Sequence, residues 1–243
     1  MKPALPDPWS ALRRHTPARI ALGRAGASLP TKEVLAFGLA HARARDAVHD
    51  ALDVEKLRAE LAALGYSPQV VTSRAADRAT YLTRPDLGRR LAEDATLSGE
   101  AEIAVAIEDG LSAVAVQRHA VPLLQALIAL DDSWKRAAIV IATQGRVALG
   151  DEIGARLKAK VVAVLIGERP GLSSPDSLGV YLTYAPKVGR TDAERNCISN
   201  IRPEGLPYPA AARKLDWLAK AALARGLTGV SLKDDSDVSP KLA

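Results

Sequence analysis

Val161-Val-Ala-Val-Leu-Ile-Gly-Glu-Arg-Pro-Gly171 is the stretch of the sequence that indicates the fold most clearly. Six apolar residues run without a break and are followed by a glycine, the charged residues Glu168 and Arg169, and a Pro-Gly turn. A continuous apolar run of strand length, rich in valine, is typical of a strand buried on both faces of a parallel sheet. Ligands of open parallel sheets bind beyond the carboxyl ends of the strands, so the pattern places Glu168 where a ligand group would lie.

Further strands and helices alternate around this strand from residue 99 onward. We predict strands over 103–107, 137–143, 161–166 and 178–184, and helices over 112–130, 151–159 and 207–225. Such alternation indicates right-handed crossovers and a parallel sheet. Residues 1–98 are predicted to be mainly helical, with one short strand near 70–72. The prediction is an α/β protein in which a smaller helical N-terminal region, 1–98, precedes a Rossmann-like domain, 99–243, with a mostly parallel sheet and flanking helices.

The composition argues against several classes of protein. The 243 residues are 48% apolar and 25% charged, which is ordinary for a soluble globular protein. The single cysteine, Cys197, allows no internal disulfide framework and fits a reducing compartment. We expect no membrane span, because no run of about 18 apolar residues occurs. The net charge of +5 is scattered and aromatic residues make up only 4%, so we expect no nucleic-acid partner.

Polar segments follow the predicted strands. Asp109-Gly110 precedes a helix and could present backbone N–H groups to a ligand, although Ser112 can equally act as a plain N-cap. Gly145-Arg146-Val147 follows the next strand. Glu168 could accept hydrogen bonds from ligand hydroxyls or amides, although a surface ion pair with Arg169 is the simpler role. Because several strand ends carry charged groups at one sheet edge, a shared site is favoured over unrelated turns.

The chain shows no self-sufficient catalytic constellation. Cys197 lies in a polar segment, 195–202, predicted to be a loop; no histidine is near in sequence to activate the thiol, and an inert packed cysteine is the more frequent case. The four histidines lack metal-ligand spacing, and no Ser/His/Asp or paired-carboxylate pattern occurs. Gly23 to Ser28 has neither the Walker nor the full dinucleotide pattern. We therefore expect no catalytic residue and no metal ligand here, as in a chain that supplies half of a site.

Five short strings occur in the same order as in one known family. They are Thr16-Pro-Ala-Arg-Ile-Ala-Leu-Gly-Arg-Ala-Gly26, Tyr81-Leu-Thr-Arg-Pro-Asp-Leu-Gly-Arg-Arg90, Asp109-Gly-Leu-Ser112, Gly167-Glu-Arg-Pro-Gly-Leu172 and Cys197-Ile-Ser-Asn-Ile201. Together they resemble the small subunits of ethanolamine ammonia-lyase. The resemblance covers nearly the whole chain, from about Trp9 to about Val230; each string alone is weak, but five in register are highly specific.

The resemblance implies a subunit of an adenosylcobalamin-dependent radical lyase, which converts ethanolamine to acetaldehyde and ammonia. It implies a separate large subunit, a (β/α)8 barrel that holds ethanolamine and faces the upper side of the corrin. The small subunit would cover the lower, nucleotide side, would be inactive alone, and would assemble as a hexamer of heterodimers. Within this chain we expect residues 1–98 to dock the large subunit and residues 99–243 to cover the cobalamin. Several members carry a long N-terminal extension that targets a bacterial microcompartment. Because this chain starts only a few residues before the shared region, a free cytoplasmic complex is favoured.

The resemblance also assigns cofactor contacts. Arg146 and Val147 match the Arg-Val pair after the second strand of the family's sheet, with Val147 the contacting position. Glu168 matches the glutamate of the Gly-Glu-Arg-Pro-Gly turn, and Cys197 the cysteine before Ile-Ser-Asn. The sheet-edge argument adds Asp109-Gly110 as further candidates. The Asp-x-His-x-x-Gly string of cobalamin proteins that replace the cofactor's own base is absent, so the resemblance implies that dimethylbenzimidazole stays on cobalt.

Two other functions remain open from the residues alone. One is a non-catalytic binding or scaffold subunit that does not contact cobalamin. The other is a nucleotide-binding oxidoreductase, which the missing glycine-rich fingerprint argues against. A neighbouring gene for a barrel subunit would separate the leading hypothesis from both.

Overall fold

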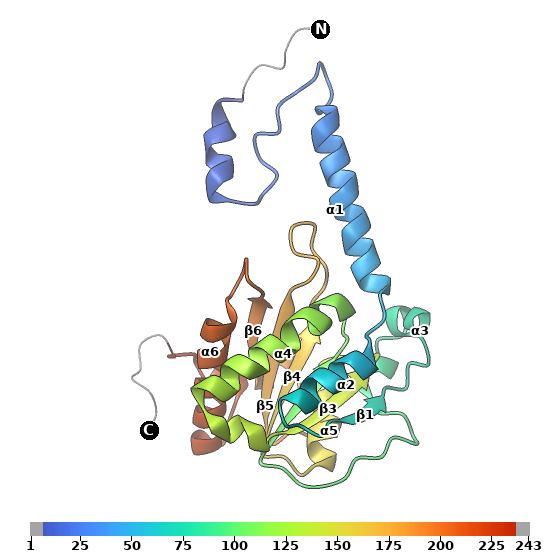
Figure 1. The fold of residues 1–243 in the computed structure, drawn as a ribbon, viewed down its shortest axis with the longest axis vertical. Helices are drawn as coiled ribbons and strands as arrows, with labels where there is room; N and C mark the ends of the chain where they lie inside the picture. Colours follow the sequence, from blue (N-terminus) through green and yellow to red (C-terminus); the bar gives the residue numbers. More distant parts are fainter. Residues whose placement is uncertain (1–6, 237–243) are drawn as a thin grey trace.

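A six-stranded β-sheet forms the centre of the molecule in the computed structural model, which describes residues 7–236 (Figure 1). The strands in spatial order are β1 (Gln69–Thr72), β3 (Ala138–Thr143), β2 (Ile103–Glu108), β4 (Val161–Gly167), β5 (Leu178–Tyr184) and β6 (Arg195–Ile201). The first four strands in this order are parallel, whereas β5 and β6 each pair antiparallel with the preceding strand. All seven residues of β4 are buried, as the continuous apolar run predicts.

The α/β class is confirmed, but the sheet is mixed and the prediction of a mostly parallel sheet is not confirmed. The predicted strand over 178–184 exists as β5 and runs antiparallel to β4, because the segment between Gly167 and Leu178 is too short for a crossover helix. The prediction of a loop at 195–202 is wrong, because 195–201 forms β6. This edge strand buries only Arg195, Ile198 and Ile201, so it lacks the alternation that would have revealed it.

Helices cover both faces of the sheet. One face packs against α2 (Val54–Ala63), α4 (Ala113–Leu130) and α6 (Tyr208–Arg225), and the other packs against α5 (Leu149–Arg156). The chain runs from β2 through α4 to β3, then through α5 back across β2 to β4. The direction of winding therefore changes at β2, and such a change opens a crevice at the carboxyl ends of the strands.

The helix α4 is a core helix of this fold. Ser112 caps its N-terminus by accepting a hydrogen bond from the backbone N–H of Ala115. By length and apolar composition α4 could cross a membrane, but half of it is buried inside the protein, including Leu123, Leu124 and Leu127. Packing against the sheet and α6 accounts for its apolar sequence.

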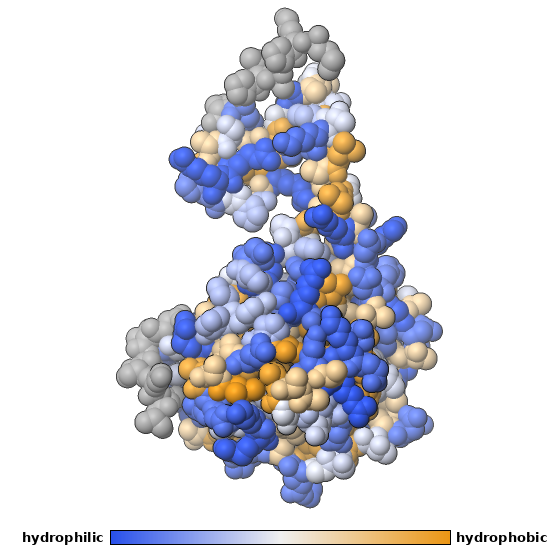
Figure 2. All heavy atoms as spheres, viewed as in Figure 1, coloured by the Kyte–Doolittle hydropathy of each residue, from blue (hydrophilic) through white to orange (hydrophobic). Residues whose placement is uncertain are grey.

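Residues 7–49 form an extension that we call the N-terminal arm. It consists of the 3-10 helix η1 (Pro8–His15), a loop and α1 (Thr31–His49), and it projects from the body of the molecule (Figures 1 and 2). An Arg13–Glu33 ion pair of 3.3 Å ties η1 to α1. Ala47 is the only α1 residue that is buried. The arm exposes Trp9, Leu12, Leu29, Val34, Leu35, Phe37 and Leu39.

Short helical segments complete the described chain. They are α3 (Arg78–Thr83), η2 (Leu87–Arg89), η3 (Asp132–Arg136), η4 (Asp192–Glu194) and η5 (Gly229–Ser231). The predicted division between residues 1–98 and 99–243 stays a prediction. The structure does place β1 in the sheet and Leu57 and Leu61 of α2 in the main core, although both elements precede residue 99.

Candidate functional site

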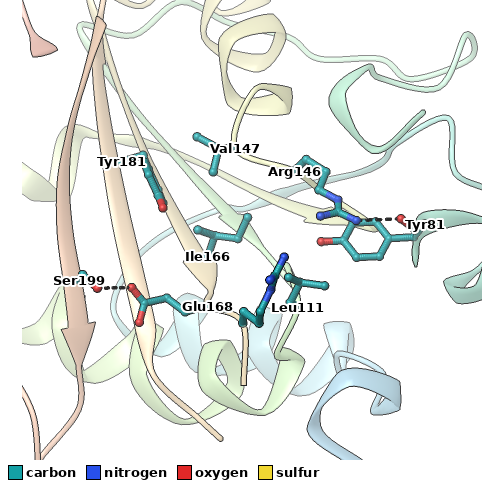
Figure 3. Close-up of a pocket in the computed structure, with 10 residues that line it drawn as sticks. Tyr81, Leu111, Arg146, Val147, Ile166, Glu168, Tyr181 and Ser199 are labelled. Atoms are coloured by element: carbon teal, nitrogen blue, oxygen red, sulfur yellow. Dashed lines mark hydrogen bonds between the residues drawn. The ribbon is translucent and has the colours of Figure 1, made fainter. Parts of the chain in front are cut away.

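A pocket of about 440 Å³ lies at the carboxyl ends of β2, β3 and β4 (Figure 3). Its lining residues are Tyr81, Leu111, Arg146, Val147, Ile166, Gly167, Glu168, Arg169, Tyr181 and Ser199. Three of the predicted site residues, Arg146, Val147 and Glu168, therefore meet at one opening. They come from the ends of β3 and β4, at the sheet edge where the change of winding at β2 favours a ligand site.

Asp109 holds the backbone that forms one side of the pocket. It follows β2, is buried, and accepts hydrogen bonds from the backbone N–H groups of Gln144 and Gly145 at 2.9 and 3.0 Å. Burial raises the pKa of Asp109, while these hydrogen bonds and the nearby Arg78 act in the opposite direction. The carboxylate therefore fixes the turn that carries Arg146.

Gly110 lets the ends of β2 and β4 approach closely. Its φ is +58°, and a Cβ atom there would lie 2.3 Å from the carbonyl oxygen of Gly167. The backbone N–H of Leu111 donates to the same oxygen at 2.9 Å. Asp109 and Gly110 thus shape the pocket without lining it, and direct contact with a ligand stays a prediction for both.

Glu168 lies on the wall of the pocket nearest β5 and β6 (Figure 3). Its carboxylate accepts a hydrogen bond from the Ser199 hydroxyl at 2.6 Å and contacts the backbone N–H of Asn200 at 3.2 and 3.3 Å. Gly179 leaves room for the Glu168 side chain, since a Cβ atom at position 179 would lie 3.1 Å from Glu168. The predicted alternative, an ion pair with Arg169, is not formed, so Glu168 is oriented by β6 instead.

The opposite wall includes the Tyr81 ring and Arg146, and a second arginine, Arg78, contacts the same ring without lining the pocket. The Tyr81 ring lies 4.6 Å from Cζ of Arg78 and 4.2 Å from Cζ of Arg146. Arg78 donates to the carbonyl oxygens of Val48 and Gly110 and faces Asp109 at 3.8 Å, so it is held by the scaffold. Arg146 donates one hydrogen bond, from Nη2 to the carbonyl oxygen of Tyr81 at 3.0 Å.

Cys197 lies beside the pocket but does not line it. It is an exposed residue of β6 and pairs with Tyr181 across the antiparallel ladder. Alternation along the strand places Cys197 and Ser199 on the same face of the sheet. Partial desolvation of the thiol raises the pKa of Cys197, a hydrogen bond with Tyr181 opposes this, and the negative charge of Glu168 adds to the rise. The thiol is therefore a neutral group near neutral pH.

Glu108 is a buried carboxyl group that no hydrogen bond from the described residues stabilises. It is fully buried at the end of β2, and neither of its side-chain oxygens has a hydrogen-bond partner within residues 7–236. Burial raises the pKa of Glu108 well above its usual value, and the negative charges of Asp109 and Asp151 act in the same direction. Glu108 does not line the pocket.

Several residues that line the pocket were not predicted from the sequence. Tyr81 and Leu111 lie within strings quoted above, but nothing in their spacing indicated that they approach β3 and β4. Tyr181 and Ser199 reach the pocket because β5 and β6 pair antiparallel. The predicted mostly parallel sheet did not indicate this pairing. In the part of the chain that the structure describes, no group of three His, Cys, Asp or Glu side chains could hold a metal ion.

Comparison with known proteins shows the family to which the chain belongs. The ethanolamine ammonia-lyase light chain family model matches residues 6–233. A protein of Xanthomonas campestris pv. campestris named ethanolamine ammonia-lyase small subunit is 56% identical over 95% of this chain and 89% of its own length. Proteins of the same name from Azotobacter vinelandii and Ralstonia nicotianae are 54% and 56% identical, over 98% and 96% of this chain and 92% and 90% of their own lengths. The chain therefore belongs to the ethanolamine ammonia-lyase small subunit family and is a subunit of a lyase.

Proposed function

We propose that this chain binds the lower, nucleotide side of adenosylcobalamin and, with a large subunit, converts ethanolamine to acetaldehyde and ammonia by a radical mechanism. The observation that carries the proposal is the meeting of Arg146, Val147 and Glu168 at one pocket on the carboxyl edge of the sheet. Glu168 would accept hydrogen bonds from amide groups of the cofactor, and Val147 would provide an apolar contact. Cys197, a neutral thiol beside Tyr181, would pack at the β6 side.

The pocket suits part of a corrinoid. Ile166, Val147 and Tyr181 supply apolar surface, while Glu168 and Ser199 supply polar groups that match an amide-rich ligand. A cavity of about 440 Å³ is too small to enclose a whole cobalamin, so a second subunit would have to cover the remainder. None of the lining residues is a histidine, which fits a cofactor that retains its own base. When bound, adenosylcobalamin supplies the radical chemistry, and this chain binds and orients it.

The name small subunit, which the relatives carry, implies that this chain has a large-subunit partner. We further propose that this partner is the barrel that holds ethanolamine, that six heterodimers assemble, and that the complex is cytoplasmic. The N-terminal arm is our candidate docking element, because Trp9, Leu35 and Phe37 are 66%, 69% and 48% exposed. Arg19 lies over the Phe37 ring at 5.4 Å, which adds positive charge beside this apolar surface.

The direct test is reconstitution. The chain is produced alone and together with an ethanolamine ammonia-lyase large subunit, and each sample is assayed for acetaldehyde with ethanolamine and adenosylcobalamin. Activity is expected only when both subunits and the cofactor are present. Activity of this chain alone would contradict its role as half of a site, and a complex that does not bind cobalamin would contradict the proposal itself.

Glu168→Gln tests the assigned contact within the assembled complex. Loss of hydrogen bonds to a charged group costs about 1.5–3 kcal/mol, so the dissociation constant of cobalamin should rise about tenfold or more. Glu102→Gln is the matched control, because Glu102 is exposed just before β2, at the opposite edge of the sheet. An unchanged dissociation constant for Glu168→Gln, with the complex intact, would limit Glu168 to a structural bond with β6.

A further inference from the structure

We propose that Arg146 binds the anionic phosphodiester of the cofactor's nucleotide tail and that the Tyr81 side of the pocket is the subsite for this group. The inference rests on the proposed function, because it assigns one part of the same ligand to one wall of the same site. It goes further by giving Arg146 a chemical role, the recognition of negative charge.

The hydrogen-bonding capacity of Arg146 is mostly unused. A guanidinium carries five N–H donors, and Arg146 uses one of them, on the carbonyl oxygen of Tyr81. Its Nε atom is buried with no hydrogen-bond partner in the described chain. The unused donors that a ligand in the pocket could reach are therefore those on the Nη atoms, which would form charge-assisted hydrogen bonds with an anionic acceptor.

Arg146 also lacks a counter-ion among the described residues. Arg78, which also contacts the Tyr81 ring, has Asp109 nearby, but Arg146 forms no ion pair within residues 7–236. Arg146 and Arg169 line the pocket against a single carboxylate, Glu168, so the pocket carries net positive charge. Glu168 is already engaged by Ser199 on the far wall. A negatively charged ligand group would therefore be drawn to the Arg146 side.

Arg146 is held in place before any ligand binds. Its guanidinium is stacked on the buried Tyr81 ring, and its backbone N–H donates to the carbonyl oxygen of Gly88 at 2.8 Å. Figure 3 shows the Tyr81 hydroxyl directed toward the middle of the pocket beside this guanidinium. That hydroxyl is also buried without a partner. A rigid, part-buried arginine loses little conformational freedom when it binds a phosphodiester.

The test uses two corrinoids with the complex of this chain and the large subunit. Cobinamide lacks the phosphate, and cobinamide methyl phosphate carries a phosphodiester without the nucleoside. Dissociation constants are measured by equilibrium dialysis from the visible absorbance of the corrinoid. Arg146→Met removes the charge but keeps bulk over Tyr81, and Arg146→Lys keeps the charge. Arg136→Met is the matched control, because Arg136 is an exposed arginine of η3, just before β3 at the opposite edge of the sheet.

The wild-type complex and Arg136→Met should bind cobinamide methyl phosphate about tenfold or more tightly than cobinamide. Arg146→Met should abolish this difference and leave cobinamide binding unchanged, whereas Arg146→Lys should retain part of it. An undiminished difference in Arg146→Met, equal binding of the two ligands by wild type, or equal weakening of both by Arg146→Met would overturn the inference while leaving cobalamin binding intact. A wild-type complex that does not bind adenosylcobalamin itself, measured in the same way, would instead show that the proposed function has failed.

Discussion

Arg195 of β6 and Asp151 in the first turn of α5 form a fully buried ion pair, with Nη–Oδ distances of 2.6 and 2.7 Å. Arg195 also donates to the Thr183 hydroxyl at 2.9 Å, which ties the pair to β5. The contact joins the antiparallel edge of the sheet to the helix that follows the Arg146–Val147 turn. It therefore fixes the position of the strand that carries Cys197 and Ser199.

Arg195→Met should lower the free energy of unfolding by about 3–5 kcal/mol, because it leaves the Asp151 carboxylate buried without its counter-ion. The double variant Arg195→Met/Asp151→Leu should lose less, since neither charge remains. Urea unfolding followed by circular dichroism measures both. Lys160→Met is the control: its ion pair with Glu102 is exposed, and its loss should have little effect. Similar effects of Arg195→Met and Lys160→Met would contradict the structural role of the buried pair.

Glu108 predicts a dependence of stability on pH. Its pKa is raised in the folded protein, so the folded state binds more protons than the unfolded state above the unfolded pKa of about 4.3. The stabilisation that Glu108 contributes is therefore greatest below the unfolded pKa, and it is lost as the pH rises toward the folded pKa. Glu108→Gln, which mimics the neutral form, should raise the free energy of unfolding at pH 8 more than at pH 5. Equal effects at the two pH values would show that Glu108 does not titrate abnormally.

The parallel part of the fold follows from local sequence. The apolar runs that form β2, β3 and β4 are long and end at turn residues, so both their existence and the edge at which Arg146, Val147 and Glu168 meet are predictable. The antiparallel part depends on tertiary contacts. β6 is held by the Arg195–Asp151 pair and by edge pairing with β5, and neither leaves a periodic apolar pattern.

The side chains that line the site were likewise only partly predictable from local sequence. Glu168 was predictable as a group at a strand end, but its orientation depends on Ser199, a residue of the strand that was missed. Tyr81 enters the pocket through stacking between Arg78 and Arg146, which are far apart in sequence. Asp109 was expected as a ligand group, whereas its two hydrogen bonds to the 144–145 backbone give it a structural role that sequence alone does not show.

Cys197 should react slowly with iodoacetamide in the complex, because the thiolate is the reactive form and partial desolvation raises the pKa of this thiol. Bound cobalamin should slow the reaction further if the thiol packs against the cofactor. The rate is measured from the mass of the peptide that contains Cys197, the one cysteine of the chain, with and without cobalamin. Urea-unfolded chain gives the reference rate. Labelling that is as fast as this reference, and is unaffected by cobalamin, would place Cys197 outside the site.

The N-terminal arm should be the main docking element for the large subunit. Deleting residues 1–30 should weaken subunit association and leave residues 99–230 folded, because the sheet and its two apolar cores lie outside the deleted segment. Sedimentation of the truncated chain mixed with large subunit measures association, and circular dichroism of the chain alone measures folding. If the complex forms with undiminished affinity, the sheet domain and not the N-terminal arm contacts the large subunit.

A single substitution on α1 sharpens this prediction. Leu35 is 69% exposed on the arm, and burying a leucine in an interface contributes about 1.5–3 kcal/mol, so Leu35→Asp should weaken association about tenfold or more. Val230→Asp is the matched control, because Val230 is 81% exposed in η5, on the body of the molecule. Both variants add one negative charge and leave the buried cores unchanged. If Val230→Asp weakens association and Leu35→Asp does not, the large subunit binds the body near η5 and the exposed apolar residues of α1 have another role.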